Sequence, residues 1–169
     1  MLNNIWQLIE KILYFIVYKI FHLKISNDKW EAFLQFVKFG IVGVSNTIIS
    51  YILYVISLFA LRKIEVSPSV DYLIAQFIGF VLSVLWSFYW NRKMVFKADN
   101  NKVPWLQALI KTYISYAFSG LFLSTVLSII WVQFIGINKM VAPILNLVIS
   151  VPINFILNKF WAFKEKKDA

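Results

Sequence analysis

The stretch SFYWNRKMVFK (Ser87–Lys97) recurs 67 residues later as NFILNKFWAFK (Asn154–Lys164). In both copies a long apolar run ends in Asn, a cation, a short amphipathic segment, Phe and Lys. Internal repeats of helical units are common in membrane proteins. A duplicated hydrophobic hairpin with basic ends, and with no obvious catalytic group, predicts a membrane protein that handles a lipid-like ligand.

The composition indicates that lipid is the solvent. Hydrophobic residues make up 60% of the 169 residues and charged residues 15%, whereas soluble domains carry about 25% charge. Four windows lack any charge: Phe39–Leu61 (23 residues), Tyr72–Asn91 (20), Thr112–Asn138 (27) and Met140–Asn158 (19). Because a spanning helix needs about 20 mostly apolar residues, we expect an all-α membrane protein with four transmembrane helices.

The N-terminal residues have a different pattern. Polar or amphipathic side chains recur every three or four positions between residues 3 and 22, opposite an apolar face. Lys11 and Lys19 interrupt the apolar run, so this segment is expected to lie in the membrane interface as an amphipathic helix. It also lacks the ordered regions of a signal peptide. The predicted organisation is an interfacial helix and linker (1–30), a first transmembrane hairpin (31–97) and a second transmembrane hairpin (98–169).

The basic residues predict the orientation. Fourteen of the 17 Lys and Arg residues lie before the first span, between the second and third spans, or after the fourth. Only Arg62, Lys63 and Lys139 lie in the other two loops. Because Lys and Arg concentrate on the cytoplasmic side, we expect a multi-pass protein of the cytoplasmic membrane with both termini in the cytoplasm.

The net charge of +9 raises the question of a nucleic-acid partner. The cations flank the ends of the spans instead of forming a soluble patch, so attraction to anionic membrane lipids explains most of them. No nucleic-acid partner is expected. The chain contains no Cys, which excludes disulfides and thiol chemistry.

Each predicted hairpin begins and ends on the same side of the membrane. Two hairpins with the same topology predict a pseudo-symmetry axis along the membrane normal. The first and third spans match more weakly than the second and fourth. In them, Phe36-Val37-Lys38 aligns with Leu109-Ile110-Lys111.

Polar residues inside the predicted spans are candidates for contact with a ligand. On the fourth span they recur every four residues and form one stripe: Asn146, Ser150, Asn154 and Asn158. Asn46 lies beside a similar stripe on the first span. Small and hydroxylated residues also serve helix packing, whereas three Asn in one span are costly to bury. A ligand-lined crevice and close helix packing both stay open as interpretations.

The acidic residues argue against two protein classes. All eight Asp and Glu residues lie outside the charge-free windows. A proton-coupled exporter normally needs a titratable carboxylate within the membrane, so a small multidrug exporter is disfavoured. The sequence also lacks paired acids, an activated nucleophile, a phosphate-binding Gly loop and a metal-ligand set. We therefore expect no enzyme, no metal site and no cofactor.

Two motifs give a resemblance to a known family. The first is FGIVGVSNT (Phe39–Thr47), and the second is NFILNKFWAF (Asn154–Phe163). The chain resembles the GtrA-like proteins, whose closing pattern is Asn-Phe-x-x-Asn-(Arg/Lys)-x-Trp-x-Phe, over roughly residues 33–164. The first-half copy differs from this pattern, with Ser87 in place of the first Asn and Met94 in place of Trp.

The resemblance implies a part in cell-surface polysaccharide or teichoic acid glycosylation. Such proteins are thought to flip a polyprenyl-monophosphate-linked sugar, such as one on undecaprenyl phosphate, across the cytoplasmic membrane. A phosphate can pair with cations at the cytoplasmic boundary. The candidate phosphate-binding residues are Arg92, Lys159, Asn91 and Asn158. The candidates for contact with the sugar, or for the crevice, are Asn46, Asn146, Ser150 and Asn154.

Another class of function also fits the sequence. The chain could be an accessory subunit that anchors or positions a membrane glycosyltransferase and transports nothing. In the carrier interpretation, four helices leave little room for an enclosed path. We therefore expect a homo-oligomer or a groove open to lipid.

Overall fold

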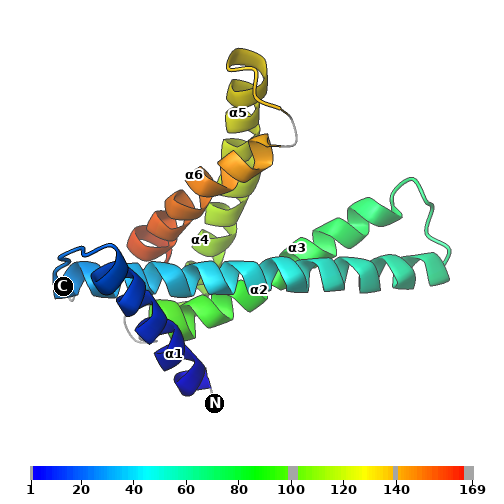
Figure 1. Cartoon of the computed structure of the whole chain (residues 1–169). Coiled ribbons are helices and arrows are strands. Elements are labelled where there is room, and N and C mark those ends of the chain that lie inside the picture. Colours follow the sequence, from blue (N-terminus) through cyan, green and yellow to red (C-terminus); the bar gives the residue numbers. More distant parts are fainter. Residues whose placement is uncertain (1, 99–102, 139–140, 166–169) are drawn as a thin grey trace. The chain divides into compact units, whose positions relative to one another are not determined.

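The structure, a computed structural model, describes residues 2–98, 103–138 and 141–165, and within these it holds helices and no strands (Figure 1). The predicted all-α fold is confirmed. The chain divides into two compact units, Met1–Val37 and Lys38–Ala169. Four of the cations counted for the predicted orientation lie outside the described residues: Lys102, Lys166 and Lys167 on the predicted cytoplasmic side, and Lys139 on the other side.

The first unit holds α1 (Leu2–Tyr14), the π-helical segment η1 (Phe15–Ile20) and the beginning of α2 (Asn27–Lys63). Tyr18 connects these elements, because its ring centroid lies 4.5 Å from that of Tyr14 and 5.3 Å from that of Trp30. Large apolar side chains of α1 and η1 are exposed, among them Ile5, Leu8, Ile12, Phe15 and Ile20. A helix with an exposed apolar face agrees with the predicted interfacial helix, whose place in the membrane stays a prediction.

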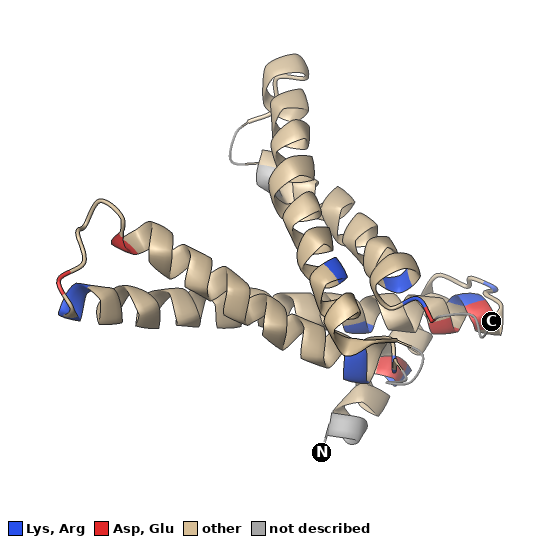
Figure 2. Cartoon of the chain, turned by 180° about the vertical axis from the view of Figure 1, so that it is seen from behind, with Lys and Arg blue, Asp and Glu red and all other residues tan. Residues whose placement is uncertain are grey.

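Four helical stretches are long and apolar enough to cross a membrane: Asn27–Lys63, Asp71–Val95, Trp105–Phe134 and Ile144–Ala162. This confirms the four predicted transmembrane helices. Each stretch extends past its charge-free window at the end predicted to be cytoplasmic, where the basic residues lie. In Figure 2 the charged residues colour mainly the helix ends and the connecting segments, whereas the long middle parts of the helices are tan.

In the second unit, the spans after α2 combine α-helices with π-helical segments. The second span is α3 (Asp71–Trp90) followed by η2 (Asn91–Val95). The third is α4 (Trp105–Ala117), η3 (Phe118–Leu123), α5 (Ser124–Ile129) and η4 (Ile130–Phe134). The fourth is α6 (Ala142–Leu157) and η5 (Asn158–Ala162). α4 contacts both α3 and η5, and α6 packs along η3 and α5 (Figure 1).

A glycine allows α2 and α3 to approach closely. A Cβ atom on Gly79 would lie 3.0 Å from the Ser50 carbonyl oxygen and 3.3 Å from the Tyr54 backbone nitrogen. These distances are shorter than ordinary van der Waals contacts, so a larger residue would push the helices apart. The Trp86 indole nitrogen also donates to the Ser45 hydroxyl over 3.2 Å. Both contacts hold the first hairpin together.

The same backbone turn closes both hairpins. η2 and η5 are five-residue π-helical turns that begin at Asn91 and Asn158, 67 residues apart. In each turn the Asn carbonyl accepts a 2.8 Å hydrogen bond from the Phe five residues later, Phe96 or Phe163. The internal repeat of the sequence is therefore also a repeat of backbone geometry. We call η2 the first exit and η5 the second exit.

The buried core lies where α3, α4 and the second exit meet. Its buried members are Phe88, Val103, Ala108, Leu109, Ala162 and Phe163. Phe96 and Phe163 occupy equivalent positions in the two repeats, and their rings stack with centroids 4.7 Å apart. Phe163 also stacks on Phe88 at 5.6 Å. Equivalent aromatic residues thus join the two hairpins at the ends that carry the candidate site.

Candidate functional site

The first exit contains a buried polar network. Asn91 is 0% exposed, and its Nδ2 donates to the Ser87 hydroxyl over 3.1 Å. That hydroxyl is also hydrogen-bonded to the hydroxyl of Tyr116 on α4. The Asn91 Oδ1 is buried and has no hydrogen-bond partner among the described residues. A buried acceptor without a partner costs about 1–3 kcal/mol, so this atom is a candidate for contact with a ligand or water.

Arg92 follows Asn91 and is also buried, with 8% of its surface exposed. Its Nη2 donates to the Val103 carbonyl oxygen over 2.6 Å. A hydrogen bond from a charged donor is stronger than one between neutral groups. The guanidinium group therefore ties the first exit to the residue two positions before α4. Its predicted contact with phosphate stays a prediction.

The second exit contains the equivalent network with more of its atoms paired. Asn158 is 0% exposed, and its Nδ2 donates to the carbonyl oxygen of Asn154 at 2.8 Å and to the Asn154 Oδ1 at 3.0 Å. The Thr112 hydroxyl, on α4, donates to the Asn158 Oδ1 over 3.3 Å. The amide of Asn158 therefore has partners for both its oxygen and its nitrogen.

The sequence alignment of the two repeats explains part of this difference. Lys38 aligns with Lys111, so the residue equivalent to Thr112 is Phe39. Phe39 is buried and packs on Phe155, with ring centroids 5.5 Å apart. A phenyl ring cannot donate a hydrogen bond, so the first repeat has no counterpart of the Thr112 hydroxyl.

Lys159 is the predicted phosphate ligand that reaches the surface. It is partly exposed, and its Nζ lies 5.5 Å from the Phe155 ring centroid and 5.7 Å from the Phe160 centroid. Lys111 lies near the same exit, where its Nζ donates to the Trp161 carbonyl oxygen over 3.2 Å. Lys111 was not among the predicted site residues, although its alignment with Lys38 marks its position in the repeat.

The polar stripe of α6 faces the third span. The Asn146 Nδ2 donates to the Ser124 carbonyl oxygen at 3.1 Å and to the Ser128 hydroxyl at 2.7 Å. Its Oδ1 is buried without a partner among the described residues. Ser150 and Asn154 are buried as well. Helix packing therefore accounts for part of the stripe. The Asn146 Oδ1 can still accept a hydrogen bond from a polar ligand.

Asn46 lies apart from this stripe, on α2. The residue is half-buried, and its Oδ1 is buried without a hydrogen-bond partner among the residues that the structure describes. The structure thus divides the predicted residues into three groups: the two exits, the stripe of α6 and the single position on α2.

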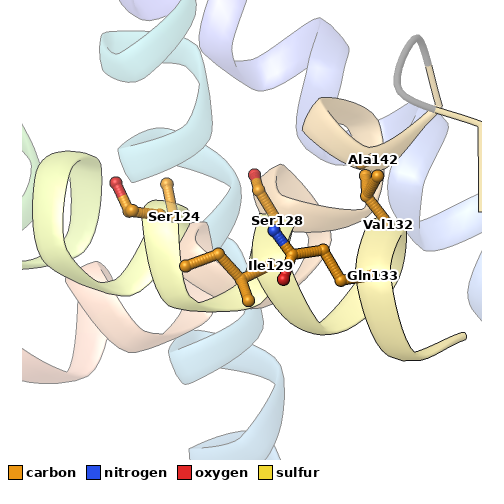
Figure 3. A pocket seen from close by; sticks show the side chains of 7 residues that line it. Ser124, Ser128, Ile129, Val132, Gln133 and Ala142 are labelled. Carbon is orange, nitrogen blue, oxygen red and sulfur yellow. The ribbon is translucent and has the colours of Figure 1, made fainter.

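An open pocket of about 450 Å³ includes Ser124 and Ser128, the two residues to which Asn146 donates. It is lined by Ser124, Thr125, Ser128, Ile129, Val132, Gln133 and Ala142. In Figure 3, Ser124, Ser128 and Gln133 project from α5 and η4, and Ala142 lies at the beginning of α6. This volume lies within the range of small-ligand pockets, and the hydroxyl and amide groups can bond to a polar ligand. Thr125 and Gln133 were not predicted from the sequence, because neither belongs to a repeated polar spacing.

An ion pair lies at the α2–α3 turn, at the opposite end of the second span from the first exit. The Arg62 Nε and the Asp71 Oδ2 are 3.0 Å apart, and Asp71 is buried at the beginning of α3. The Asp71 Oδ1 also accepts from the backbone nitrogen of Tyr72 over 2.6 Å. A carboxylate at a helix N-terminus interacts favourably with the helix dipole, and the Arg partner adds a charge-assisted hydrogen bond. This pair therefore fixes the turn that connects the first two spans.

Comparison with known proteins places this geometry in context. A family model described as "GtrA/DPMS, transmembrane domain" matches residues 38–163. The match covers all four residues of the two Asn–cation pairs. It also covers the candidate polar residues of α2 and α6, Asn46, Asn146, Ser150 and Asn154.

Curated proteins similar to this chain include a bactoprenol-linked glucose translocase of Shigella phage SfII, which is 28% identical over 136 residues (78% of this chain and 97% of that protein). A cell wall teichoic acid glycosylation protein GtcA of Listeria monocytogenes is 28% identical over 97 residues (57% and 67%). A dolichol-phosphate mannosyltransferase of Pyrococcus furiosus is 29% identical over 140 residues, which are 79% of this chain. The aligned region is only 36% of that archaeal protein.

Proposed function

Since the chain belongs to the GtrA/DPMS transmembrane domain family, we propose that it flips a polyprenyl-monophosphate-linked sugar across the cytoplasmic membrane. The observation that carries the proposal is the pair of equivalent π-helical exits, each with a buried Asn followed by a cation, at the ends of long apolar spans. Relatives named as a bactoprenol-linked glucose translocase and a teichoic acid glycosylation protein support it. In this role the chain is a carrier and the sugar–phosphate bond is made by another protein.

The phosphate would bind at headgroup depth, beside the exits. Lys159 supports this most directly, because its ammonium group is partly exposed beside two aromatic rings. Arg92 follows the buried Asn91, and its charged guanidinium group is held at the first exit by the bond from its Nη2 to the Val103 carbonyl oxygen. Asn91 and Asn158 would hold the neighbouring cations in place, since both are buried and hydrogen-bonded.

The sugar would meet the polar atoms farther along the spans. Asn146 has a buried acceptor without a partner among the described residues, and its amide donates to Ser124 and Ser128, which line the open pocket of about 450 Å³. Asn46 offers another such acceptor on α2. Ser150 and Asn154 extend the polar surface of α6 toward the second exit. A sugar is rich in hydroxyl groups, so such acceptors lower the cost of its passage while the polyprenyl tail stays in lipid.

The proposal includes a topology and partners. Both termini and the segment between α3 and α4 would face the cytoplasm, following the distribution of the basic residues. A second copy of the chain would complete the path, because four helices enclose little space. A membrane glycosyltransferase would use the sugar after its transfer, and anionic lipids would surround the basic exits.

Translocation in a defined membrane tests the proposal. The purified chain is reconstituted in liposomes with a labelled polyprenyl-phosphate sugar, and the fraction of label that becomes accessible to an impermeant reagent is followed. We expect transfer in minutes, compared with negligible transfer in protein-free liposomes. Equal rates with and without the protein would refute the carrier role.

An accessory role is the second candidate. It is favoured by the Pyrococcus furiosus relative, which is named as a dolichol-phosphate mannosyltransferase. The region that matches this chain makes up 36% of that protein. In that role the chain would anchor or position a separate glycosyltransferase. Co-purification with a membrane glycosyltransferase, combined with no transfer in liposomes, would support it over the carrier.

A further inference from the structure

We propose that the first exit carries the docking surface for the head group of the sugar lipid. This aromatic–cation surface consists of Trp86, Tyr89, Trp90 and Lys93. Lys93 pairs with the phosphate, and the rings hold the sugar. The inference rests on the proposed function, because it names where and how the same ligand is recognised. It adds residues that were not predicted as phosphate or sugar ligands.

The four side chains form one contiguous cluster. The Trp90 ring centroid lies 5.6 Å from that of Trp86 and 5.2 Å from that of Tyr89, in edge-to-face arrangements. The Lys93 Nζ lies 5.5 Å from the Tyr89 centroid and 5.9 Å from the Trp90 centroid. It also donates to the Tyr89 hydroxyl over 3.2 Å. These contacts hold the ammonium group beside the ring faces.

The cluster is open to a ligand. Lys93 is exposed, and Tyr89 and Trp86 are 51% and 38% exposed. An ammonium group has three N–H donors, and the Tyr89 hydroxyl takes one of them, which leaves donors for a phosphate oxygen. The Trp90 indole nitrogen is buried without an acceptor among the described residues. A ligand oxygen would satisfy this donor, so a polar occupant lowers the free energy of the site.

The second repeat has no such cluster. The residues equivalent to Trp86, Tyr89 and Trp90 are Ile153, Ile156 and Leu157, and Phe160 stands in place of Lys93. Both exits nevertheless form the same π turn. The aromatic residues and Lys93 are therefore not required for the backbone geometry, and their presence at one exit only is explained by recognition of a ligand.

The chemistry of the cluster matches a phosphorylated sugar. The Lys93 ammonium group, which lies beside the Tyr89 and Trp90 rings, can bind a monophosphate as a compact point charge. The apolar C–H faces of a sugar pack on aromatic rings, and the Tyr89 hydroxyl can bond to its polar edges. Leu82, Trp86, Tyr89 and Lys93 follow one another at intervals of three or four residues on one face of the helix. The tail would therefore extend into lipid on the Leu82 side.

Binding measurements with two probes test the inference. The full chain in phosphatidylcholine nanodiscs is titrated with a polyprenyl monophosphate and with the same lipid carrying a hexose. Lys93→Gln is expected to weaken the binding of both probes about tenfold, because a charge-assisted contact is lost. Tyr89→Leu and Trp86→Leu are expected to weaken only the hexose-bearing probe, by about threefold to tenfold.

The second exit supplies the matched controls. Trp161→Leu removes a ring that lies 5.7 Å from the Lys111 ammonium group, and Lys164→Gln removes an exposed cation. Both variants are expected to bind like the unmodified chain. If binding of the hexose lipid is unchanged in Lys93→Gln and Tyr89→Leu, the docking surface is refuted and the proposed function stands. If the unmodified chain binds neither probe, both the docking surface and the proposed function fail.

A further arm separates the sugar lipid from ordinary anionic lipids. Nanodiscs with about one-third phosphatidylglycerol present competing phosphate groups at the same depth. The inference predicts that the hexose lipid still binds, and that Tyr89→Leu still weakens it. Complete loss of binding in these nanodiscs would show that the surface is a general anchor for anionic lipids, and would overturn the inference.

Discussion

The first exit, Asn91–Val95, and the second exit, Asn158–Ala162, have the same five-residue π turn and the same 2.8 Å hydrogen bond to the next Phe. Their side chains differ. At the second exit the Asn amide is fully paired, through Thr112 and Asn154. At the first exit the Asn oxygen and the neighbouring indole nitrogen of Trp90 lack partners among the described residues. The duplicated backbone is thus retained in both halves, whereas, among the described residues, buried polar atoms without partners occur at the first exit and not at the second.

If the two exits are equivalent ends of parallel hairpins, both must face the same side of the membrane. Single Cys residues at Lys97 and Lys164, which follow the two exits, are expected to label together with a membrane-impermeant thiol reagent. A Cys at the exposed Ser69, in the α2–α3 turn, is expected to label only from the opposite side. The chain has no native Cys to interfere. Labelling of positions 97 and 164 from different sides would rule out parallel hairpins.

The stacked Phe pair should show the largest difference in stability. Phe163 is buried, whereas the equivalent Phe96 is half-buried. Phe163→Ala is expected to lower the free energy of unfolding by about 3–5 kcal/mol, because it leaves a cavity under Phe88 and Phe96. Phe96→Ala should have a clearly smaller effect. Unfolding in detergent with increasing denaturant measures both, and equal losses would contradict the asymmetric core.

Substitutions of the cations at the two exits should separate an effect on stability from an effect on ligand binding. Arg92→Gln is expected to lower the unfolding free energy by about 1.5–3 kcal/mol, since the charged bond to Val103 is lost, and also to reduce surface-polymer glycosylation. Lys159→Gln should reduce glycosylation about tenfold without a change in stability.

Complementation at equal membrane abundance measures the effect of these substitutions. Lys97→Gln and Lys164→Gln serve as controls, because both are exposed and occupy equivalent positions just beyond the exits. If all four variants behave alike, the cations act only as membrane anchors. The polar stripe of α6 would then be the better candidate for the site.

The buried Asn residues should show the smallest difference. Asn158→Ala removes hydrogen bonds to two residues and leaves their buried groups unpaired, so a loss of about 1–3 kcal/mol is expected. Asn91→Ala removes one bond together with an atom that has no partner, so the loss should be about 1 kcal/mol or less. Thermal unfolding of the two variants, side by side, measures the difference. A greater loss for Asn91→Ala would indicate a partner of its oxygen that the described residues do not supply.

Much of the fold follows from the sequence because lipid imposes simple demands. An apolar run of about 20 residues must be a helix in a bilayer, so the spans could be recognised without knowing their neighbours. The 67-residue spacing likewise predicted that Asn91 and Asn158 occupy equivalent positions in two repeated hairpins. The chain's membership of the family was also visible, in the motif at Asn154–Phe163.

The candidate site was less predictable, because side-chain partners depend on packing. Arg92 looks like a surface cation in the sequence, yet its partner is the Val103 carbonyl oxygen, and a backbone carbonyl has no sequence signature. The four-residue spacing predicts that the polar residues of α6 share one face. It cannot show that Asn146 on this face donates to Ser124 and Ser128. Lys93 and its aromatic neighbours resemble an ordinary interfacial belt until their distances are known.

The π turns also have a consequence for changes in chain length. A π turn holds one residue more than an α-helical turn, and each helical residue rotates the chain by about 100°. Deletion of one residue inside Asn91–Val95, such as Met94, would leave hydropathy and span length almost unchanged. The shortened segment would close as an α-helical turn, so Phe96 would keep nearly the same direction toward Phe163 and the aromatic stack would be retained. The extra residue of each π turn is therefore a place where the chain can lose one residue without reorienting the segment that follows.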